Sequence, residues 1–281
     1  MQSVAEIKAV LAQRGDGPKR ALGQNFLIDH SKIVALLERA APGPGSLVLE
    51  VGPGTGTLTD ELAASGADVL AVELDEFFVE HIRRRFASTG RVRVHRGDCL
   101  ERKGDLNVAA SSRLDEMGAS ERGYTLIANL PYNAASGLMV ALAWDRRCLG
   151  QHVTIQRDVA QRVRAEVGTR DYSALTVMLR AVCDARRIAT LPPGCFWPSP
   201  KVTSEMISIE PRAEAAERIE SGLREPLERL CRRLFTSRRK TLRSILGDIA
   251  WPAGIDPGMR PEVVAPEELI VLARRLDGEV G

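Results

Sequence analysis

The sequence predicts an α/β protein in which a mostly parallel sheet is flanked by helices and followed by a small all-α domain. Short apolar runs typical of buried strands alternate with segments of helical periodicity up to about residue 210. A glycine-rich turn follows the first of these runs, and beyond Pro211 the chain becomes helical and strongly basic. We therefore expect one domain over residues 1–210, with a lead-in over 1–24, and a second domain over 211–281.

Composition limits the possible classes of protein. The 281 residues are 44% hydrophobic and 27% charged, which is ordinary for a globular chain, and the net charge of +2 says little about partners. The apolar stretch Leu138–Trp144 is too short to span a bilayer, and Met1–Gln13 resembles an amphipathic helix more than a signal segment. The five cysteines are scattered, so we expect no metal site, no disulfide framework and a cytoplasmic location.

The first βαβ unit is the clearest local signal. Leu47–Val51 has the pattern of a buried strand and leads into the turn Gly52–Gly56. Thr57–Ala64 continues as a helix, and Asp68–Val72 forms a second strand that ends at Glu73. An acid at this position, about 20 residues beyond the glycines, suits the hydroxyl groups of a ribose.

The glycine pattern narrows the choice of ligand. Gly52 and Gly54 let a ligand approach the backbone closely, but Thr57 occupies the place of the last glycine in the dinucleotide pattern G-x-G-x-x-G. A nucleoside cofactor without phosphates therefore fits better, and S-adenosylmethionine is the obvious candidate, because its sulfonium needs only orientation and an apolar environment. The alternatives are a tight turn without a ligand and a nucleotide-dependent oxidoreductase.

A third strand adds a further acid to the same edge of the sheet. The helix Glu76–Phe86 precedes the strand Val92–His95, which leads into Gly97 and Asp98. The Asp98 carboxylate is placed to accept a hydrogen bond from an adenine amino group. An ordinary loop or helix-capping aspartate is the alternative.

The tetrapeptide Asn129-Leu130-Pro131-Tyr132 follows the apolar strand Tyr124–Ala128. Proline blocks further ladder pairing, so the tetrapeptide should lie at the carboxyl end of its strand, where ligands bind in open α/β sheets. An amide, a backbone carbonyl and an aromatic face suit a planar base with an exocyclic amino group. An ordinary strand-ending turn is the alternative.

Two segments outside the βαβ pattern are harder to interpret. Gln24–Leu27 is either a lead-in packed beside the core or a ligand contact, and Asp29 or Ser31 can cap the helix that follows it. Lys201–Ile209 alternates in the manner of a strand at the edge of a sheet.

Basic residues gather in the C-terminal part of the chain. Residues 229–246 contain no acid, and their basic side chains are interrupted by leucines, as in an amphipathic helix pair with one basic face. We expect this face to contact phosphates of structured RNA, with a solvated surface as the alternative. The candidate RNA-binding residues are Lys19, Arg20, Arg232, Arg233, Arg238, Arg239, Lys240 and Arg243.

Taken together, these motifs resemble a family. Residues 47–56, Glu73, Gly97-Asp98 and residues 129–133 look like a class I S-adenosylmethionine-dependent methyltransferase with a Rossmann-like sheet. Gln24–Leu27 narrows the resemblance to the rRNA adenine N6-dimethyltransferases, and Phe196–Val202 agrees with that family. Ser237–Leu242 favours the small-subunit branch. The resemblance covers nearly the whole chain from Lys19 onward.

The resemblance implies roles for individual residues. In that family the positions matching Asn25, Leu27, Gly52, Glu73 and Asp98 contact the cofactor, and the position matching Asn129 touches both cofactor and base. It further suggests that Phe196 stacks on the base opposite Tyr132.

The implied substrate is a pair of adjacent adenines in the terminal hairpin of small-subunit rRNA, each dimethylated within a pre-assembled subunit by a monomeric enzyme. The alternatives are a large-subunit rRNA adenine methyltransferase of the macrolide-resistance type and a non-catalytic ribosome assembly factor with the same fold. Ala134 and Trp197 depart from the usual family residues, which leaves the shape of the base pocket in question.

Overall fold

The computed structural model describes residues 2–15, 17–19, 23–101, 104–132 and 134–278. The chain divides into two compact units. The first unit comprises Met1–Leu142, Arg147–Arg157 and Arg186–Glu210, and the second comprises Ala143–Arg146, Asp158–Ala185 and Pro211–Gly281. The second unit thus takes in two segments that lie within 1–210 of the sequence, in addition to the C-terminal residues. The assignment of 211–281 as an RNA-binding domain stays a prediction.

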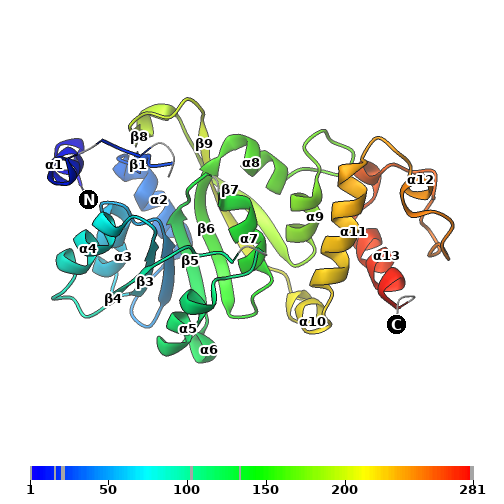
Figure 1. Ribbon diagram of the computed structural model, residues 1–281, viewed down its shortest axis with the longest axis horizontal. Helices are drawn as coiled ribbons and strands as arrows, with labels where there is room; N and C mark the ends of the chain where they lie inside the picture. Colours follow the sequence, from blue (N-terminus) through cyan, green and yellow to red (C-terminus); the bar gives the residue numbers. More distant parts are fainter. Residues whose placement is uncertain (1, 16, 20–22, 102–103, 133, 279–281) are drawn as a thin grey trace. The chain divides into compact units, whose positions relative to one another are not determined.

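A seven-stranded sheet forms the centre of the fold, in the order β4-β3-β2-β5-β6-β9-β7 (Figure 1). Neighbouring strands from β4 to β6 are parallel, and β9 is antiparallel to β6. The strands of the sheet are β2 (Leu47–Val51), β3 (Asp68–Glu73), β4 (Val92–Arg96), β5 (Tyr124–Asn129), β6 (Cys148–Gln156), β7 (Cys183–Leu191) and β9 (Ser204–Pro211). A separate antiparallel pair joins β1 (Phe26–Leu27) to β8 (Phe196–Trp197).

The strand order reverses direction between β2 and β5. From β2 the chain moves outward through β3 to β4, and from β5 it moves the other way to β6. In open α/β sheets a crevice opens at the carboxyl ends of the two strands where this reversal occurs, because the connections depart to opposite sides. The glycine-rich turn and Asn129 follow these two strands, so the topology alone brings them together.

Helices connect the strands of the first unit. The side chain of Asp29 accepts a hydrogen bond from the Lys32 N–H and caps α2, as one of the two sequence alternatives proposed. Leu36, Leu62 and Val69 belong to a buried apolar cluster between helices and sheet. The helices are α1 (Val4–Arg14), α2 (His30–Ala40), α3 (Thr57–Ala64), α4 (Glu76–Arg85), α5 (Val108–Glu116), α6 (Ala119–Arg122) and α7 (Ala135–Ala143).

The second unit is helical. Helix α11 buries Leu227, Leu230 and Leu234 along one face, with its arginines on the other. The Tyr172 hydroxyl donates a hydrogen bond to the Val264 carbonyl at 2.8 Å. The elements are α8 (Arg157–Val163), α9 (Ala174–Arg180), α10 (Ala215–Glu220), α11 (Arg224–Thr236), α12 (Leu242–Leu246), η3 (Pro261–Val263) and α13 (Pro266–Gly278). The short helix η2 (Pro193–Cys195), which precedes β8, belongs to the first unit. Within the described ranges, none of the helices is apolar over a length that would cross a bilayer.

The sheet differs from the sequence prediction at β9 and β7. The prediction of an edge strand over Lys201–Ile209 is wrong, because β9 lies between β6 and β7 and is buried from Ser204 to Ile209. Small serines at 204 and 208 fit inside, so alternation with polar residues does not signal exposure here. The sequence pattern also missed β7, the last strand in the order of the sheet, in which Asp184, Arg186 and Arg187 are exposed.

Candidate active site

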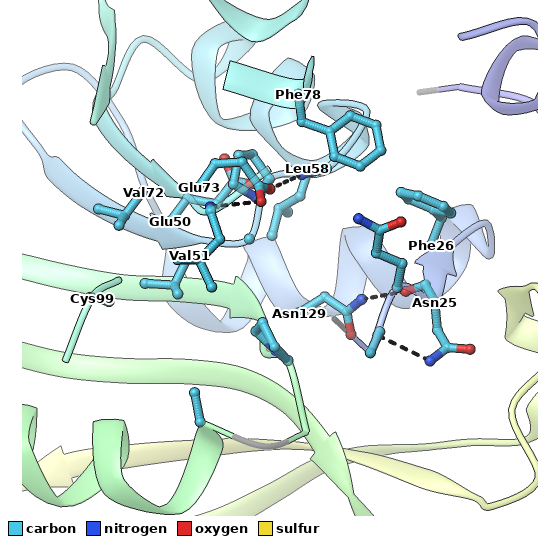
Figure 2. Close-up of a pocket in the computed structure, with 18 of the residues that line it drawn as sticks. Asn25, Phe26, Glu50, Val51, Leu58, Val72, Glu73, Phe78, Cys99 and Asn129 are labelled. Carbon is cyan, nitrogen blue, oxygen red and sulfur yellow. Dashed lines mark hydrogen bonds between the residues drawn. The ribbon is translucent and has the colours of Figure 1, made fainter. Parts of the chain in front are cut away.

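A cavity of about 490 Å³ opens at the carboxyl ends of the central strands (Figure 2). All its lining residues belong to the first unit. The apolar side chains of Leu58, Val72 and Phe78 form part of its wall. It is also lined by every residue that the sequence assigned to a cofactor: Asn25, Leu27, Gly52, Gly54, Glu73, Asp98 and Asn129.

Gly52 and Gly54 are required both because other residues lie too close for a side chain and because of their backbone conformation. Gly52 and Gly54 adopt φ angles of +75° and +56°. A Cβ atom at Gly52 would lie 3.3 Å from Pro131 Cγ, and one at Gly54 would lie 2.9 Å from a ring carbon of Phe26. Side chains at these two positions would therefore displace Pro131 and Phe26, which also line the cavity.

The Glu73 carboxylate is held by backbone donors. Its Oε2 accepts the Gly54 N–H at 3.2 Å, and its Oε1 accepts the Leu74 and Asp75 N–H groups at 2.9 Å each. Burial raises the pKa of Glu73, and the three backbone N–H groups act in the opposite direction because they stabilise the ionised form. The carboxylate is thereby fixed at the tip of β3, where the sequence predicted a ribose contact.

Asp98 also lines the cavity, just beyond β4, the neighbour of the strand that carries Glu73. Its Oδ1 accepts the Leu100 N–H at 3.1 Å, and the Gly97 N–H donates to the Glu73 carbonyl at 3.0 Å. The side chain is exposed, so its second oxygen can accept a ligand donor. The aspartate thus has a local turn contact and a place in the cavity, and the two sequence interpretations of this residue are compatible.

Asn129 joins two distant parts of the chain. Its Nδ2 donates to the Asn25 carbonyl at 2.9 Å across 104 residues of sequence (Figure 2). A carbonyl can only accept, so this bond fixes which way the amide points, with its Oδ1 directed away from Asn25. Asn25 itself donates its side-chain amide to the Gly23 carbonyl at 3.1 Å. The cavity therefore presents an oriented amide acceptor at the end of β5.

The residues beside Asn129 are placed differently from one another. Pro131 lines the cavity, whereas Leu130 is 2% exposed and donates its N–H to the Thr154 carbonyl at 3.1 Å. The Tyr132 hydroxyl lies 3.3 Å from Ser204 Oγ.

Phe196, which the resemblance implied as a second stacking surface, is 3% exposed and packs in the apolar cluster with Leu27 and Ile33. The structure thus gathers Asn129 and Pro131 at the cavity, and leaves Leu130, Tyr132 and Phe196 outside its lining. The roles of the last three stay predictions.

The family model for ribosomal RNA adenine dimethylase matches residues 16–268. The chain belongs to the ribosomal RNA adenine dimethylase family. It is 35% identical over 267 residues to the ribosomal RNA small subunit methyltransferase A of Methylococcus capsulatus, a match that covers 92% of this chain and 98% of the relative. The corresponding protein of Chromobacterium violaceum is 35% identical over 92% of this chain and 95% of the relative. Membership confirms the predicted family and the predicted enzyme class.

Two solved structures share the fold of this dimethylase family member. A dimethyladenosine transferase from Plasmodium falciparum has a TM-score of 0.70 at 21% identity, covering 91% of this chain and 98% of that one. The 23S rRNA methyltransferase ErmE has a TM-score of 0.64 at 24% identity, covering 90% of this chain and 100% of that one. These similarities confirm the predicted methyltransferase sheet flanked by helices.

Sequence reasoning missed Glu50, which lies in β2 and lines the cavity of this dimethylase. It is 2% exposed, and the Thr59 hydroxyl donates to its Oε2 at 2.7 Å. Burial raises the pKa of Glu50 to about 8, against the smaller opposing effect of the Thr59 hydrogen bond. A glutamate within the otherwise apolar strand Leu47–Val51 was the available signal, because buried acids are rare without a function or a partner.

The predicted RNA-binding residues of the second unit are not all equally available. Arg232 pairs with Glu228 at 2.9 Å, Arg233 donates to the Ile245 carbonyl at 3.1 Å, and Arg243 lies 3.8 Å from Asp248. Arg238 donates to the Arg170 carbonyl and lies 3.9 Å from Glu262. Arg239 and Lys240 are exposed. In the first unit Lys19 contacts Asp75 at 2.9 Å, and Arg20 lies outside the described residues.

Proposed function

We propose that this enzyme transfers methyl groups from S-adenosylmethionine to N6 of two adjacent adenines in the 3′-terminal hairpin of small-subunit rRNA, giving N6,N6-dimethyladenosines. The observation that carries the proposal is the Asn129 amide, which is oriented by Asn25 within the same cavity that holds Glu73 and the glycine-rich turn. The names of the relatives, ribosomal RNA small subunit methyltransferase A, support the choice of substrate.

The residues of the cavity fit this cofactor. Glu73 provides acceptors for ribose hydroxyls, and Asp98 provides one for an adenine amino group. Among the described residues, the Thr55 hydroxyl is buried without a hydrogen-bond partner, so the glycine-rich turn retains a donor for a polar group of the ligand. Leu27 and Leu58 give the apolar surround that a sulfonium requires. When bound, the cofactor supplies an electrophilic methyl group on that sulfonium.

The chain's own groups prepare the acceptor. The lone pair of an adenine N6 is delocalised into the ring, which makes it a weak nucleophile. Hydrogen bonds from N6 to Asn129 Oδ1 and to the Leu130 carbonyl draw the two N–H groups out of the ring plane and restore the lone pair. Tyr132 stacks on the flipped base. After the N–C bond forms, the nitrogen loses a proton to solvent, so a neutral amide suffices and no general base is needed.

Apart from the flipped base, the RNA is held outside the cavity. In this proposal the exposed Arg239 and Lys240, with the arginines of α11, contact phosphates of a pre-assembled small subunit, and the enzyme acts as a monomer.

The proposal is tested with purified small subunits and, separately, large-subunit rRNA, both from cells that lack this enzyme. Incubation with labelled S-adenosylmethionine should produce dimethyladenosine in the small-subunit hairpin, located by reverse-transcription stops and mass spectrometry of fragments. Label that appears only in large-subunit rRNA would contradict the substrate assignment. Absence of label from both substrates, with bound cofactor, would favour a non-catalytic assembly factor.

A further inference from the structure

The first residues of the chain reach the glycine-rich turn. Gln2 is 2% exposed, its Nε2 donates to the Thr55 carbonyl at 2.8 Å, and its Oε1 accepts the Thr57 hydroxyl at 3.2 Å. Both partners line the cavity. Gln2 therefore uses both ends of its amide, one on the glycine-rich turn and one on the first residue of α3, in a place where an unsatisfied amide would be costly. No sequence motif pointed to this residue.

Helix α1 holds Gln2 in place. Ser3 and Glu6 form a capping box that begins the helix directly after Gln2, with Ser3 N–H donating to Glu6 at 2.6 Å. The buried face of α1, which includes Ile7 and Leu11, packs against Phe26 and Phe78.

The Phe26 and Phe78 rings meet edge to face with centroids 5.9 Å apart, and both line the cavity. The helix thus forms a second layer behind an aromatic wall of the site.

The far end of the segment is fastened to the turn that carries Glu73. Arg14 Nη1 and Lys19 Nζ each lie 2.9 Å from Asp75 Oδ2. The side chains of Asp75 and Arg14 are only 3% and 7% exposed, so this pair is less screened by water than a surface pair. Burial raises the pKa of Asp75, but the hydrogen bonds from Lys19 and the Phe77 N–H and the two cationic charges outweigh it and lower that pKa. Asp75 in turn donates its N–H to Glu73.

We infer that the described residues between Gln2 and Lys19, which we name the N-terminal clasp, position the cofactor-binding turns. Gln2 fixes the glycine-rich turn, and Arg14 with Lys19 fixes the Glu73 turn through Asp75. These are positioning residues, since they touch the turns and leave the ligand contacts to Gly54, Glu73 and their neighbours. Preorganised turns bind more tightly because less conformational entropy is lost on binding. The inference rests on the proposed function in that the ligand is S-adenosylmethionine.

The first test compares Gln2→Ala with Gln13→Ala. Gln13 is an exposed glutamine near the end of α1, so it controls for the loss of a glutamine from the same N-terminal segment. Calorimetric titration with S-adenosylmethionine and with S-adenosylhomocysteine should show affinity about tenfold weaker for Gln2→Ala and unchanged for Gln13→Ala. With saturating cofactor, kcat should change less than twofold. If the Gln2 contact were purely structural, Gln2→Ala would lower the unfolding temperature, but added cofactor would raise that temperature by as much as in the unmodified enzyme. The clasp predicts that cofactor raises the unfolding temperature of Gln2→Ala by a smaller amount.

The second test replaces both cations, Arg14→Gln with Lys19→Gln, and uses Arg83→Gln as control. Arg83 pairs with Glu80 at 2.7 Å on the exposed surface of α4, where an ion pair contributes little. The double variant should also bind both ligands about tenfold more weakly. This variant decides the inference by itself if Gln2→Ala does not fold.

The possible outcomes distinguish a failure of the clasp inference from a failure of the proposed function. If the unmodified enzyme binds neither ligand, the proposed function fails. If it binds them and the clasp variants match their controls in affinity, the clasp is overturned and the proposed function stands. Weaker cofactor binding by Gln2→Ala and by the double variant supports the clasp.

Discussion

The polar groups of the cavity and those of helix α11 are fixed in different ways. Glu73 is buried and bound by three backbone N–H groups, and Asn129 is bound to a backbone carbonyl. On α11, Arg229 and Arg232 are 57% and 72% exposed and pair with acids one helical turn earlier, Glu225 and Glu228. Backbone partners hold a side chain in one place, whereas long side chains in water hold each other loosely.

This difference determines how each region responds to change. Removing one partner from a buried hydrogen bond leaves a desolvated group, which costs about 1–3 kcal/mol. An exposed ion pair contributes about 0–1 kcal/mol and is screened by salt. We therefore expect single residues to control the cavity, and the basic face to act through the sum of its charges.

The largest effect is expected at Asn129. Asn129→Ala removes the oriented acceptor and should lower kcat about 1,000-fold, since the incoming N6 loses a preorganised partner. Cofactor affinity should stay measurable by calorimetry. Asn107→Ala is the matched control, because Asn107 caps α5 and takes no part in the cavity. Methylation retained by the Asn129 variant at wild-type rate would remove the amide from the mechanism.

Glu73→Gln should have the next largest effect. The amide places its NH₂ group against backbone N–H donors that now lack an acceptor, so cofactor affinity should fall about 10- to 100-fold. Glu76→Gln, three residues further on and 68% exposed, should bind as the unmodified enzyme does. Titration calorimetry measures both. Equal cofactor affinity for the two variants would show that the buried Glu73 contributes no more to binding than the exposed Glu76.

The pH dependence of stability tests whether Glu50 behaves as a buried acid. Its pKa is about 8 in the folded chain against an ordinary 4.5, so between these values the folded chain keeps a proton that the unfolded chain has lost. Stability must then fall as pH rises from about 5 to 8, by at most about 1.4 kcal/mol per pH unit. Glu50→Gln should remove that part of the slope in urea unfolding. An identical slope in both proteins would show that Glu50 is ionised in the fold.

The smallest effect is expected on the basic face. Arg239→Gln with Lys240→Gln should weaken RNA binding less than tenfold at physiological salt and reduce the slope of log K against log salt by about 1.5. Arg229→Gln should change the slope less, because its charge is already paired with Glu225 and Asp277. Filter binding over a range of salt concentrations measures the slopes. Equal slopes for the two variants would exclude Arg239 and Lys240 from the interface.

The sequence predicted the parts of the site that have local signals. The turn Gly52–Gly56 and the acid at Glu73 follow strands whose apolar runs are unambiguous, and the parallel order then brings Asn129 beside them. Gln2 was not predicted because its two partners lie more than fifty residues away and no local pattern records them.

Phe196 marks another limit. Its place in a matched motif predicts that Phe196 stacks on the base. Its burial in the core cluster depends on the pairing of β1 with β8, which a local sequence pattern does not predict. β9 is a similar case, because its alternating pattern predicts an edge strand, whereas it lies between β6 and β7 and is buried from Ser204 to Ile209.

The position of β9 has a consequence for how the enzyme is made. The described residues that line the cavity all lie between Gly23 and Ala134, so the nascent chain contains them when less than half of it has been translated. β9 is synthesised last of the seven strands and inserts between β6 and β7. The Ser204 partner of Tyr132 arrives with it. Translation therefore supplies the described lining of the cavity first, and the serine that lies against the Tyr132 hydroxyl only with the last strand.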